Sequence, residues 1–331
     1  MSFSVTLREG IERLQMGLAK EVLEGNVRAT AKLMRDVEDG LPSAIEELKV
    51  LYPYTGRSHI TGITGSPGSG KSTLVDALVD VFRKRDKTVG VVAIDPSSPF
   101  SGGAVLGDRI RMQRHATDKG VFIRSLATRG WYGGLSRATT NVINIMDAMG
   151  KDIILVETVG VGHTEVDIMN FAHTSIVVLV PGSGDWVQTV KAGILEIADI
   201  FVINKADKEG ANELAVELQA ILRLNAYPPE AWKPQILLTE ALNNKGVDKL
   251  VDGIYQHREF LIASGGYDTH LKEKVKLELM EVLKGSLMDR VSQVINKDDY
   301  LQRLVDDLTN RRTDPYSAAS EIIKKLQEGS F

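Results

Sequence analysis

Residues 65–72 read GSPGSGKS and place two glycines, a lysine and a serine at the spacing G-x-x-x-x-G-K-[ST]. In this pattern the backbone N–H groups of a glycine-rich loop surround a chain of phosphates, and glycine permits the backbone angles and the close approach that this needs. The lysine reaches the β- and γ-phosphates, and the serine hydroxyl binds Mg²⁺. We therefore predict a nucleotide phosphate site formed by Gly65, Ser66, Pro67, Gly68, Ser69, Gly70, Lys71, Ser72 and Thr73.

The residues on either side of this loop have the character that the motif requires. An apolar run with Ile60 and Ile63 precedes it and is typical of a buried strand, and LVDALVDVF after Ser72 has helical spacing. A helix that begins near Lys71 would point its positive end at the phosphates. A glycine-rich loop that matched by chance would lack these flanks, so we prefer the phosphate site.

Residues 204–207, NKAD, follow another apolar run and indicate which base the nucleotide carries. The carboxylate of Asp207 can accept hydrogen bonds from both the N1–H and the 2-amino group of guanine, whereas adenine lacks this pair of donors. The alternative is an aspartate that caps a helix after an exposed lysine. A later strand end, TEA, fits the further loop around guanine only loosely. The predicted base site is Asn204, Lys205, Asp207, Thr239, Ala241 and Leu242.

Three carboxylates are candidate Mg²⁺ ligands beside Ser72, namely Asp95, Asp108 and Glu157. Nucleotide-bound Mg²⁺ takes oxygen ligands in an octahedron and keeps several waters, so two or three acidic groups that act partly through water are expected. Asp108 could instead be a surface helix cap. Gly160 would let a backbone N–H approach the γ-phosphate, and we predict that Glu157 and Gly160 act in catalysis with Lys71.

Apolar, strand-like runs alternate with helical stretches from residue 59 onward. Runs so continuously apolar suit strands that are buried on both faces, and with helices between them they predict an α/β fold with a mostly parallel, doubly wound sheet. Such sheets bind ligands at the carboxyl ends of their strands, where Gly65, Asp95, Glu157 and Asn204 all fall. The expected strands are 59–65, 88–95, 120–124, 152–158, 174–181, 199–204 and 235–239.

Breaks in the pattern divide the chain into three predicted regions. Residues 1–57 form an N-terminal helical region, 58–264 a P-loop domain and 265–331 a C-terminal helical arm. Apolar side chains of the arm recur at helical spacing and need to be covered, either within a domain of their own or by a second subunit. This stripe consists of Val275, Leu279, Val282, Leu283, Leu287, Val291 and Val294.

Composition excludes several classes of protein. The 331 residues include no cysteine, which removes disulfides, thiolate catalysis and cysteine-based metal sites. The net charge of −4 gives no overall attraction to nucleic acid or to an anionic membrane. The apolar runs are too short to span a bilayer, and the first residues do not resemble a signal peptide. We therefore expect a cytoplasmic protein.

Together GSPGSGKST, IDPSSPFSGGAVLGDRIRM, ETVGVG, GDWVQTVKAGILE, NKAD and TDPYSAA closely resemble the MeaB/ArgK family of P-loop GTPases over nearly the whole chain. The family contains accessory proteins of adenosylcobalamin-dependent acyl-CoA mutases, chiefly methylmalonyl-CoA mutase. The resemblance implies a homodimeric, Mg²⁺-dependent GTPase that converts GTP to GDP and phosphate and acts as a chaperone of such a mutase. It would gate cofactor loading and protect or reactivate the enzyme.

The resemblance also implies roles for particular residues. It places the Mg²⁺ acids at Asp95, Asp108 and Glu157, and a mobile relay loop at 182–192 whose polar members are Asp185, Gln188 and Lys191. Val161 stands where Ras-like enzymes carry a glutamine that positions water, so we expect slow intrinsic hydrolysis. His163, Trp131, Tyr132 and Trp186 depart from the common family pattern and leave the partner open.

Two other functions are alternatives to a mutase-associated GTPase. The family label of a lysine/arginine/ornithine transport kinase suggests an ATPase or protein kinase, but NKAD selects guanine and the kinase motifs H-R-D and D-F-G are absent. A metallochaperone GTPase would need metal ligands, and the chain offers no cysteine and 6 histidines that are scattered in the sequence. The sequence leaves open whether the mutase acts on methylmalonyl-CoA, isobutyryl-CoA or ethylmalonyl-CoA.

Overall fold

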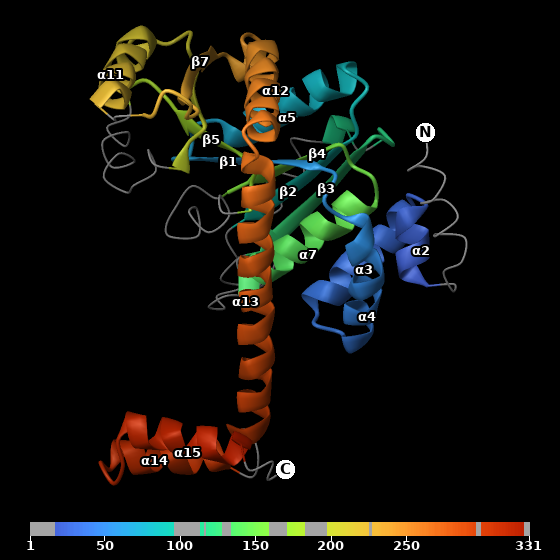
Figure 1. The fold of residues 1–331 in the computed structure, drawn as a ribbon, viewed down its shortest axis with the longest axis vertical. Helices are drawn as coiled ribbons and strands as arrows, with labels where there is room; N and C mark the ends of the chain where they lie inside the picture. The colour runs from blue at the N-terminus through green and yellow to red at the C-terminus, as the bar shows by residue number, and fades with distance from the viewer. Residues whose placement is uncertain are drawn as a thin grey trace. The chain divides into compact units, whose positions relative to one another are not determined.

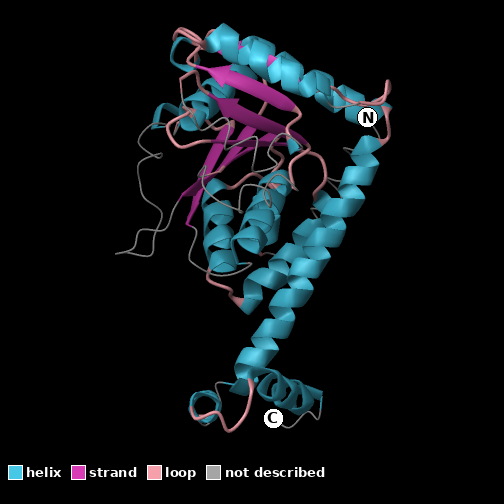
Figure 2. Cartoon of the chain, turned by 90° about the vertical axis from the view of Figure 1, so that its left-hand side faces the viewer, coloured by secondary structure: helices cyan, strands magenta, loops and turns pink. Residues whose placement is uncertain are grey.

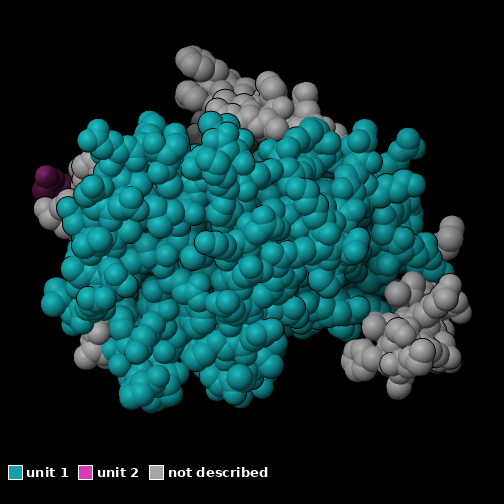
Figure 3. All heavy atoms as spheres, turned by 90° about the horizontal axis from the view of Figure 1, so that it is seen from above, with its two compact units in different colours: residues 1–274 teal, residues 275–331 magenta. Residues whose placement is uncertain are grey.

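The computed structural model describes residues 17–95, 113–115, 117–127, 134–158, 171–182, 197–224, 227–295 and 299–327. By its internal contacts the chain divides into two compact units, residues 1–274 and 275–331, which Figure 3 shows in teal and magenta. The division falls inside the long helix α13 (Gly266–Ile295).

A seven-stranded sheet lies at the centre of the first unit, and all its neighbouring strands run parallel (Figure 1). The strand order is β3-β2-β4-β1-β5-β6-β7. Every residue of β1, β4, β5 and β6 is buried, as the continuous apolar runs predicted. The predicted α/β fold with a parallel, doubly wound sheet is confirmed. The strands are β1 (His59–Gly65), β2 (Val89–Asp95), β3 (Val121–Ala127), β4 (Ile153–Glu157), β5 (Thr174–Leu179), β6 (Ile200–Asn204) and β7 (Gln235–Thr239).

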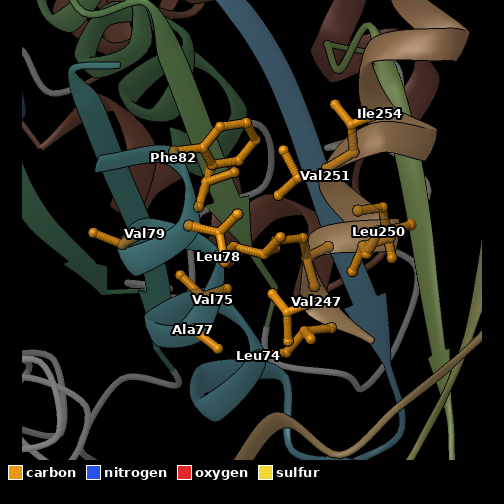
Figure 4. Close-up of a cluster of buried hydrophobic side chains, with 14 of the residues drawn as sticks. Leu74, Val75, Ala77, Leu78, Val79, Phe82, Val247, Leu250, Val251 and Ile254 are labelled. Atoms are coloured by element: carbon orange, nitrogen blue, oxygen red, sulfur yellow. The ribbon is translucent and has the colours of Figure 1, made fainter. Parts of the chain in front are cut away.

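One face of the sheet is covered by α5 (Lys71–Lys84) and α12 (Val247–Ala263). Successive side chains of a strand point to opposite faces, so Val89 and Val91 of β2 pack on this side and Val92 on the other. Apolar residues of the two helices recur every three or four positions and meet between them, where Figure 4 shows Phe82 and Leu78 of α5 near Val251 of α12. This core fixes α5, the helix that follows the phosphate loop, against the sheet.

The opposite face of the sheet is covered by α7 (Gly134–Ala148). Three N-terminal helices pack against α7 and share its core. These are α2 (Leu18–Leu23), α3 (Val27–Glu38) and α4 (Pro42–Leu51), the last beginning at Pro42, a residue that suits the first position of a helix. Toward β5 and β6 this face is covered by α11 (Ala211–Leu224). Figure 2 shows strands in magenta with helices on both sides. No described helix has the length and apolar character needed to cross a membrane.

The link between α4 and β1 is held by a single carboxylate. Asp147, at the end of α7, accepts backbone N–H bonds from Gly56 (2.5 Å), Arg57 (3.1 Å) and Ser58 (3.0 Å). A buried carboxylate needs such donors, because an unpaired charge away from water is costly. The short 3₁₀ helix η1 (Tyr52–Tyr54) forms the first part of this link.

The second unit contains the remainder of α13 together with α14 (Tyr300–Thr309) and α15 (Pro315–Gln327). The Tyr300 hydroxyl donates to Glu321 (2.9 Å), and the Lys325 ammonium lies 3.7 Å from the Tyr300 ring centroid. These contacts tie α14 to α15, with Leu304 and Ala318 buried. Asp314 caps α15 by accepting from the N–H groups of Tyr316 and Ser317.

The histidines are less scattered than the sequence suggested, because four of the 6 gather at the amino edge of the sheet. The ring of His173 lies 5.3 Å from that of His59, 4.6 Å from Tyr267 and 5.6 Å from His270. His59 and His257 both contact the Thr174 hydroxyl, at 2.8 and 2.9 Å. No group of three His, Cys, Asp or Glu side chains among the described residues could hold a metal ion.

The low pKa values of the histidines in this cluster predict that acid destabilises the fold. Burial lowers the pKa of His59 to about 3, with Arg258 lowering it further, and burial also holds the pKa of His173 well below its ordinary value. The unfolded chain, in which histidine has a pKa of about 6.5, therefore takes up these protons first. We expect the free energy of unfolding to fall as the pH drops from about 6.5 to 4, by about 1.4 kcal/mol per pH unit for each such histidine.

Denaturant unfolding at pH 7, 6 and 5 measures this slope. His173→Asn keeps an acceptor for the N–H of Ile60, which now donates to His173 Nδ1 at 3.0 Å, and removes the titration. His59→Gln likewise keeps a polar partner for Thr174. Each variant should lose less stability between pH 7 and 5 than the parent protein. Parallel curves for parent and variants would contradict the prediction.

Candidate functional site

The carboxyl ends of five strands bring the predicted site residues to one edge of the sheet. Gly65 ends β1 at the centre of the sheet. Asp95 and Glu157 end β2 and β4 on one side of it, and Asn204 and Thr239 end β6 and β7 on the other. The strand order thus separates the acidic residues from the NKAD sequence and places the glycine-rich loop between them. This is the edge where parallel sheets bind ligands.

Two glycines of the loop are required by close contacts. Gly65 has φ 145°, and a Cβ there would lie 2.2 Å from the carbonyl oxygen of Val178 in β5. Gly70 has φ 91°, and its Cβ would lie 2.5 Å from Asn204 Nδ2. Both φ values lie in the region that favours glycine. Any side chain at either position would therefore push the loop away from its neighbouring strands.

Helix α5 begins directly after this loop. Gly70 is its N-cap and offers no side chain to bond the first N–H groups, which leaves these donors for a ligand. Lys71 is buried, and its ammonium donates to the carbonyl oxygens of Gly65 (2.8 Å) and Ser66 (3.1 Å). The chain thus gathers a cation and a helix N-terminus at the loop, an arrangement that suits an anionic phosphate.

Ser72 and Glu157 meet beside the loop. The Ser72 hydroxyl donates to Glu157 Oε1 at 2.6 Å, and Glu157 is buried. A hydroxyl and a carboxylate oxygen in contact suit Mg²⁺, which prefers oxygen ligands and takes the rest from phosphates and water. The pair therefore fits the predicted ion, although no set of three ligating His, Cys, Asp or Glu side chains exists among the described residues.

Asn204 connects the phosphate loop to the NKAD side of the edge. Its buried amide Nδ2 donates to the carbonyl of Ser69 (2.9 Å), while Oδ1 accepts from the Thr239 hydroxyl (3.1 Å) and the Ala241 N–H (3.2 Å). These described hydrogen bonds go to the protein, so the side chain braces three segments against one another. Thr239 and Ala241 take part in the same brace.

Lys205 and Asp207 lie next to this brace. Lys205 has φ 57°, and its ammonium donates to the Gly68 carbonyl of the phosphate loop at 2.8 Å. The Ala206 N–H donates to the Thr239 carbonyl (3.0 Å), which holds the NKAD turn against the end of β7. Asp207 is exposed and Leu242 is 87% exposed. Both side chains are therefore open to a base at this edge.

A pair of buried threonines that no sequence motif indicated, Thr64 and Thr158, lies behind the site. The Thr158 hydroxyl donates to the Thr64 hydroxyl at 2.9 Å, and the Thr158 N–H donates to the Ile63 carbonyl at 3.0 Å. The bond ties the residue after Glu157 to the residue before Gly65. In the sequence, the only indication of this contact was that Thr64 is next to Gly65 and Thr158 is next to Glu157.

Several predicted residues cannot be placed. Of Asp95 only the backbone is described, at the end of β2. The remaining ones lie outside the described residues; these are Asp108, Gly160, Asp185, Gln188 and Lys191, together with Trp131, Tyr132, Val161, His163 and Trp186.

Residues 30–296 match the model of the family described as methylmalonyl Co-A mutase-associated GTPase MeaB. The chain belongs to the MeaB family. This confirms the resemblance seen in the motifs, and the protein is a GTPase-family member with a P-loop fold.

Curated relatives agree with this assignment. A putative GTPase of Pyrococcus abyssi is 48% identical over 316 residues, covering 95% of this chain and 97% of its own. GTPase ArgK of Escherichia coli is 34% identical over 268 residues and covers 78% of each chain. A solved structure titled LAO/AO transport system kinase superposes with a TM-score of 0.66 at 24% identity and covers 98% of each chain. At that identity the likeness shows a shared fold.

Proposed function

We propose that this MeaB-family protein binds GTP with Mg²⁺ and hydrolyses it to GDP and phosphate. The supporting observation is the Asn204 amide, which holds the phosphate loop through Ser69 and the end of β7 through Thr239 and Ala241. The exposed Asp207 carboxylate therefore lies on the same edge as the phosphate loop, at the side where a guanine would lie when its phosphates occupy that loop.

Each residue of the site has a separate role in the proposed hydrolysis. The Lys71 ammonium and the N–H groups at the start of α5 stabilise the negative charge that develops on the phosphate oxygens. Ser72 and Glu157 would hold Mg²⁺, which neutralises part of the phosphate charge when it is bound. Gly160 would offer its backbone N–H to the γ-phosphate, as the sequence predicts. With Val161 at the position of the water-orienting glutamine, hydrolysis by the protein alone is slow.

Base selectivity tests this function. Because Asp207 accepts from two donors of guanine, and a hydrogen bond to a charged group contributes about 1.5–3 kcal/mol, GTP should bind about 10²–10⁴-fold more tightly than ATP. Asp207→Asn should weaken GTP binding and shift preference toward xanthosine triphosphate, whose edge exchanges donor for acceptor. Calorimetry measures all three affinities.

Glu209→Gln is the matched control, because it neutralises an exposed carboxylate of the same loop and should leave the preference unchanged. Equal affinities of the parent protein for ATP and GTP would refute guanine selectivity.

We propose further that two copies associate through the C-terminal arm. The supporting observation is the apolar surface of α13, where long side chains remain exposed, and a two-fold pairing of identical faces is the commonest way to cover such a surface. The exposed residues are Leu271, Val275, Leu277, Leu279, Met280, Val282, Leu283, Leu287 and Met288.

Light scattering at micromolar concentration tests the dimer. The parent protein should have twice the mass of one chain, and Leu283→Asp combined with Leu287→Asp should yield a monomer, because charges in an apolar interface are left unpaired. Lys272→Glu, which adds negative charge at another exposed position of α13, should remain dimeric. A monomeric parent protein would contradict the proposal.

We propose that the partner is an adenosylcobalamin-dependent acyl-CoA mutase, in line with the description of the matched family. GTP would order the segments after Asp95 and Glu157, and hydrolysis would release them. If the mutase binds the GTP state more tightly, it must tighten GTP binding by the same factor. Hydrolysis would then gate cofactor loading or the removal of damaged cofactor, with Asp185, Gln188 and Lys191 as relay.

Turnover of GTP with and without the cognate mutase tests this coupling. The mutase should raise turnover of the parent protein, because it supplies a conformation that the slow enzyme lacks. Gln188→Ala and Lys191→Ala should keep the basal rate and lose the increase, while Lys71→Ala should be inactive in both conditions. If the complex forms and turnover does not change, the protein is a nucleotide-dependent scaffold without the proposed coupling.

A further inference from the structure

The connection between β7 and α12, residues 240–246, is folded back on itself around Glu240. The Glu240 N–H donates to the Lys245 carbonyl (3.0 Å), and the Lys245 N–H donates to the Glu240 carbonyl (3.2 Å). The Asn243 N–H also donates to the Glu240 carbonyl, at 2.9 Å. These bonds close the short 3₁₀ helix η3 (Ala241–Asn243) into a compact loop.

The Glu240 carboxylate supplies the side-chain contacts of this loop. Its Oε2 accepts from the Asn243 amide at 3.0 Å, and the Lys245 ammonium lies 3.2 Å from Oε1 and 3.0 Å from Oε2. The carboxylate side chain is only 18% exposed, whereas that of Lys245 is 68% exposed. The bonds from Asn243 and Lys245 hold the pKa of Glu240 below its ordinary value, because both favour the charged carboxylate.

The backbone at the far end of the loop leaves little freedom. Asn244 has φ 54° and Gly246 has φ 75°. A Cβ at Gly246 would lie 2.2 Å from the Leu238 carbonyl oxygen, so the chain passes directly against β7 before α12 begins. The loop is thus fixed at Lys245 and Gly246 on one side and at Glu240 on the other.

The two residues after Glu240 lie at the base side of the site. The Ala241 N–H donates to Asn204 Oδ1 at 3.2 Å, which joins the loop to the same amide that holds the phosphate loop. Leu242 follows and is 87% exposed, although it is a large apolar side chain. The neighbouring turn is held close by the bond from Ala206 N–H to the Thr239 carbonyl. An apolar side chain held at this place offers a surface for the flat face of a base.

We propose that Glu240 is a positioning residue for the purine base: by holding Asn243 and Lys245 it preorganises loop 240–246, so that Leu242 packs against the base recognised by Asp207. This rests on the proposed function. An exposed ion pair usually contributes little, because its side chains lose entropy when they are held. Here the carboxylate binds two donors within one loop, so the entropy of ordering the loop is lost before the nucleotide arrives, and affinity rises accordingly.

Comparison of a ligand that has a base with one that lacks it isolates this role. GDP affinity is measured by calorimetry, and inorganic tripolyphosphate is measured as a competitor of a fluorescent GDP. Glu240→Ala should weaken GDP binding about tenfold and leave tripolyphosphate unchanged. Glu240→Gln, which keeps an acceptor for Asn243, should retain most of the affinity. In turnover assays Glu240→Ala should raise KM for GTP and leave kcat unchanged, because the phosphate side is not altered.

Glu213→Ala is the control, since it removes an exposed carboxylate of α11 away from this loop. The proposal is overturned if Glu240→Ala leaves GDP affinity unchanged, or if it weakens GDP and tripolyphosphate equally, which would indicate a general loss of structure. A parent protein that binds GDP no better than ADP refutes the proposed function itself. A selective parent with unaffected Glu240 variants refutes only this inference.

Discussion

One buried amide holds the site together. The amide group of Asn204 donates to the phosphate loop and accepts from the end of β7. Because the side chain is buried, losing either partner would leave a polar atom unpaired, which costs free energy of folding. Gly70 must be a glycine because a Cβ there would lie 2.5 Å from Asn204 Nδ2. The separation between the phosphate loop and the NKAD turn is therefore set by one side chain at the end of β6, and the proposed recognition of both ends of a nucleotide depends on it.

The sheet explains why so few contacts suffice. The strands of the described sheet all run in one direction, so residues from distant parts of the sequence end at the same edge. Because both faces of the sheet are buried under helices, the register of each strand is fixed. A shift of β2 by one residue would turn Val89 and Val91 away from the core that contains Phe82. With the strands fixed, Glu157 is placed by the end of β4 itself, and the short turns after β1 and β6 place Lys71 and Asp207.

The sequence was most informative where the physical signal is local. Continuous apolar runs located all seven strands to within a few residues, and motif spacing located the loop before Lys71. It could not show that Asn204 uses its side chain to bind the protein, because a motif says which residues gather and not which atoms face each other. The cluster around His173 and the bond between Thr64 and Thr158 join residues far apart in the chain, so only the strand order brings them together. The contacts of Glu240 depend on a turn geometry that residue types alone do not determine.

The carboxylate of Asp147 connects α7 to the chain that leads from the N-terminal helices into β1. Because it bonds the N–H groups of Gly56, Arg57 and Ser58, and because Leu33 and Met34 share a core with α7, the N-terminal helices are attached to the sheet both through the chain that leads into β1 and through α7. A protein that bound α3 or α4 would therefore contact a layer that shares its core with β2 and β4, the two strands that end at Asp95 and Glu157.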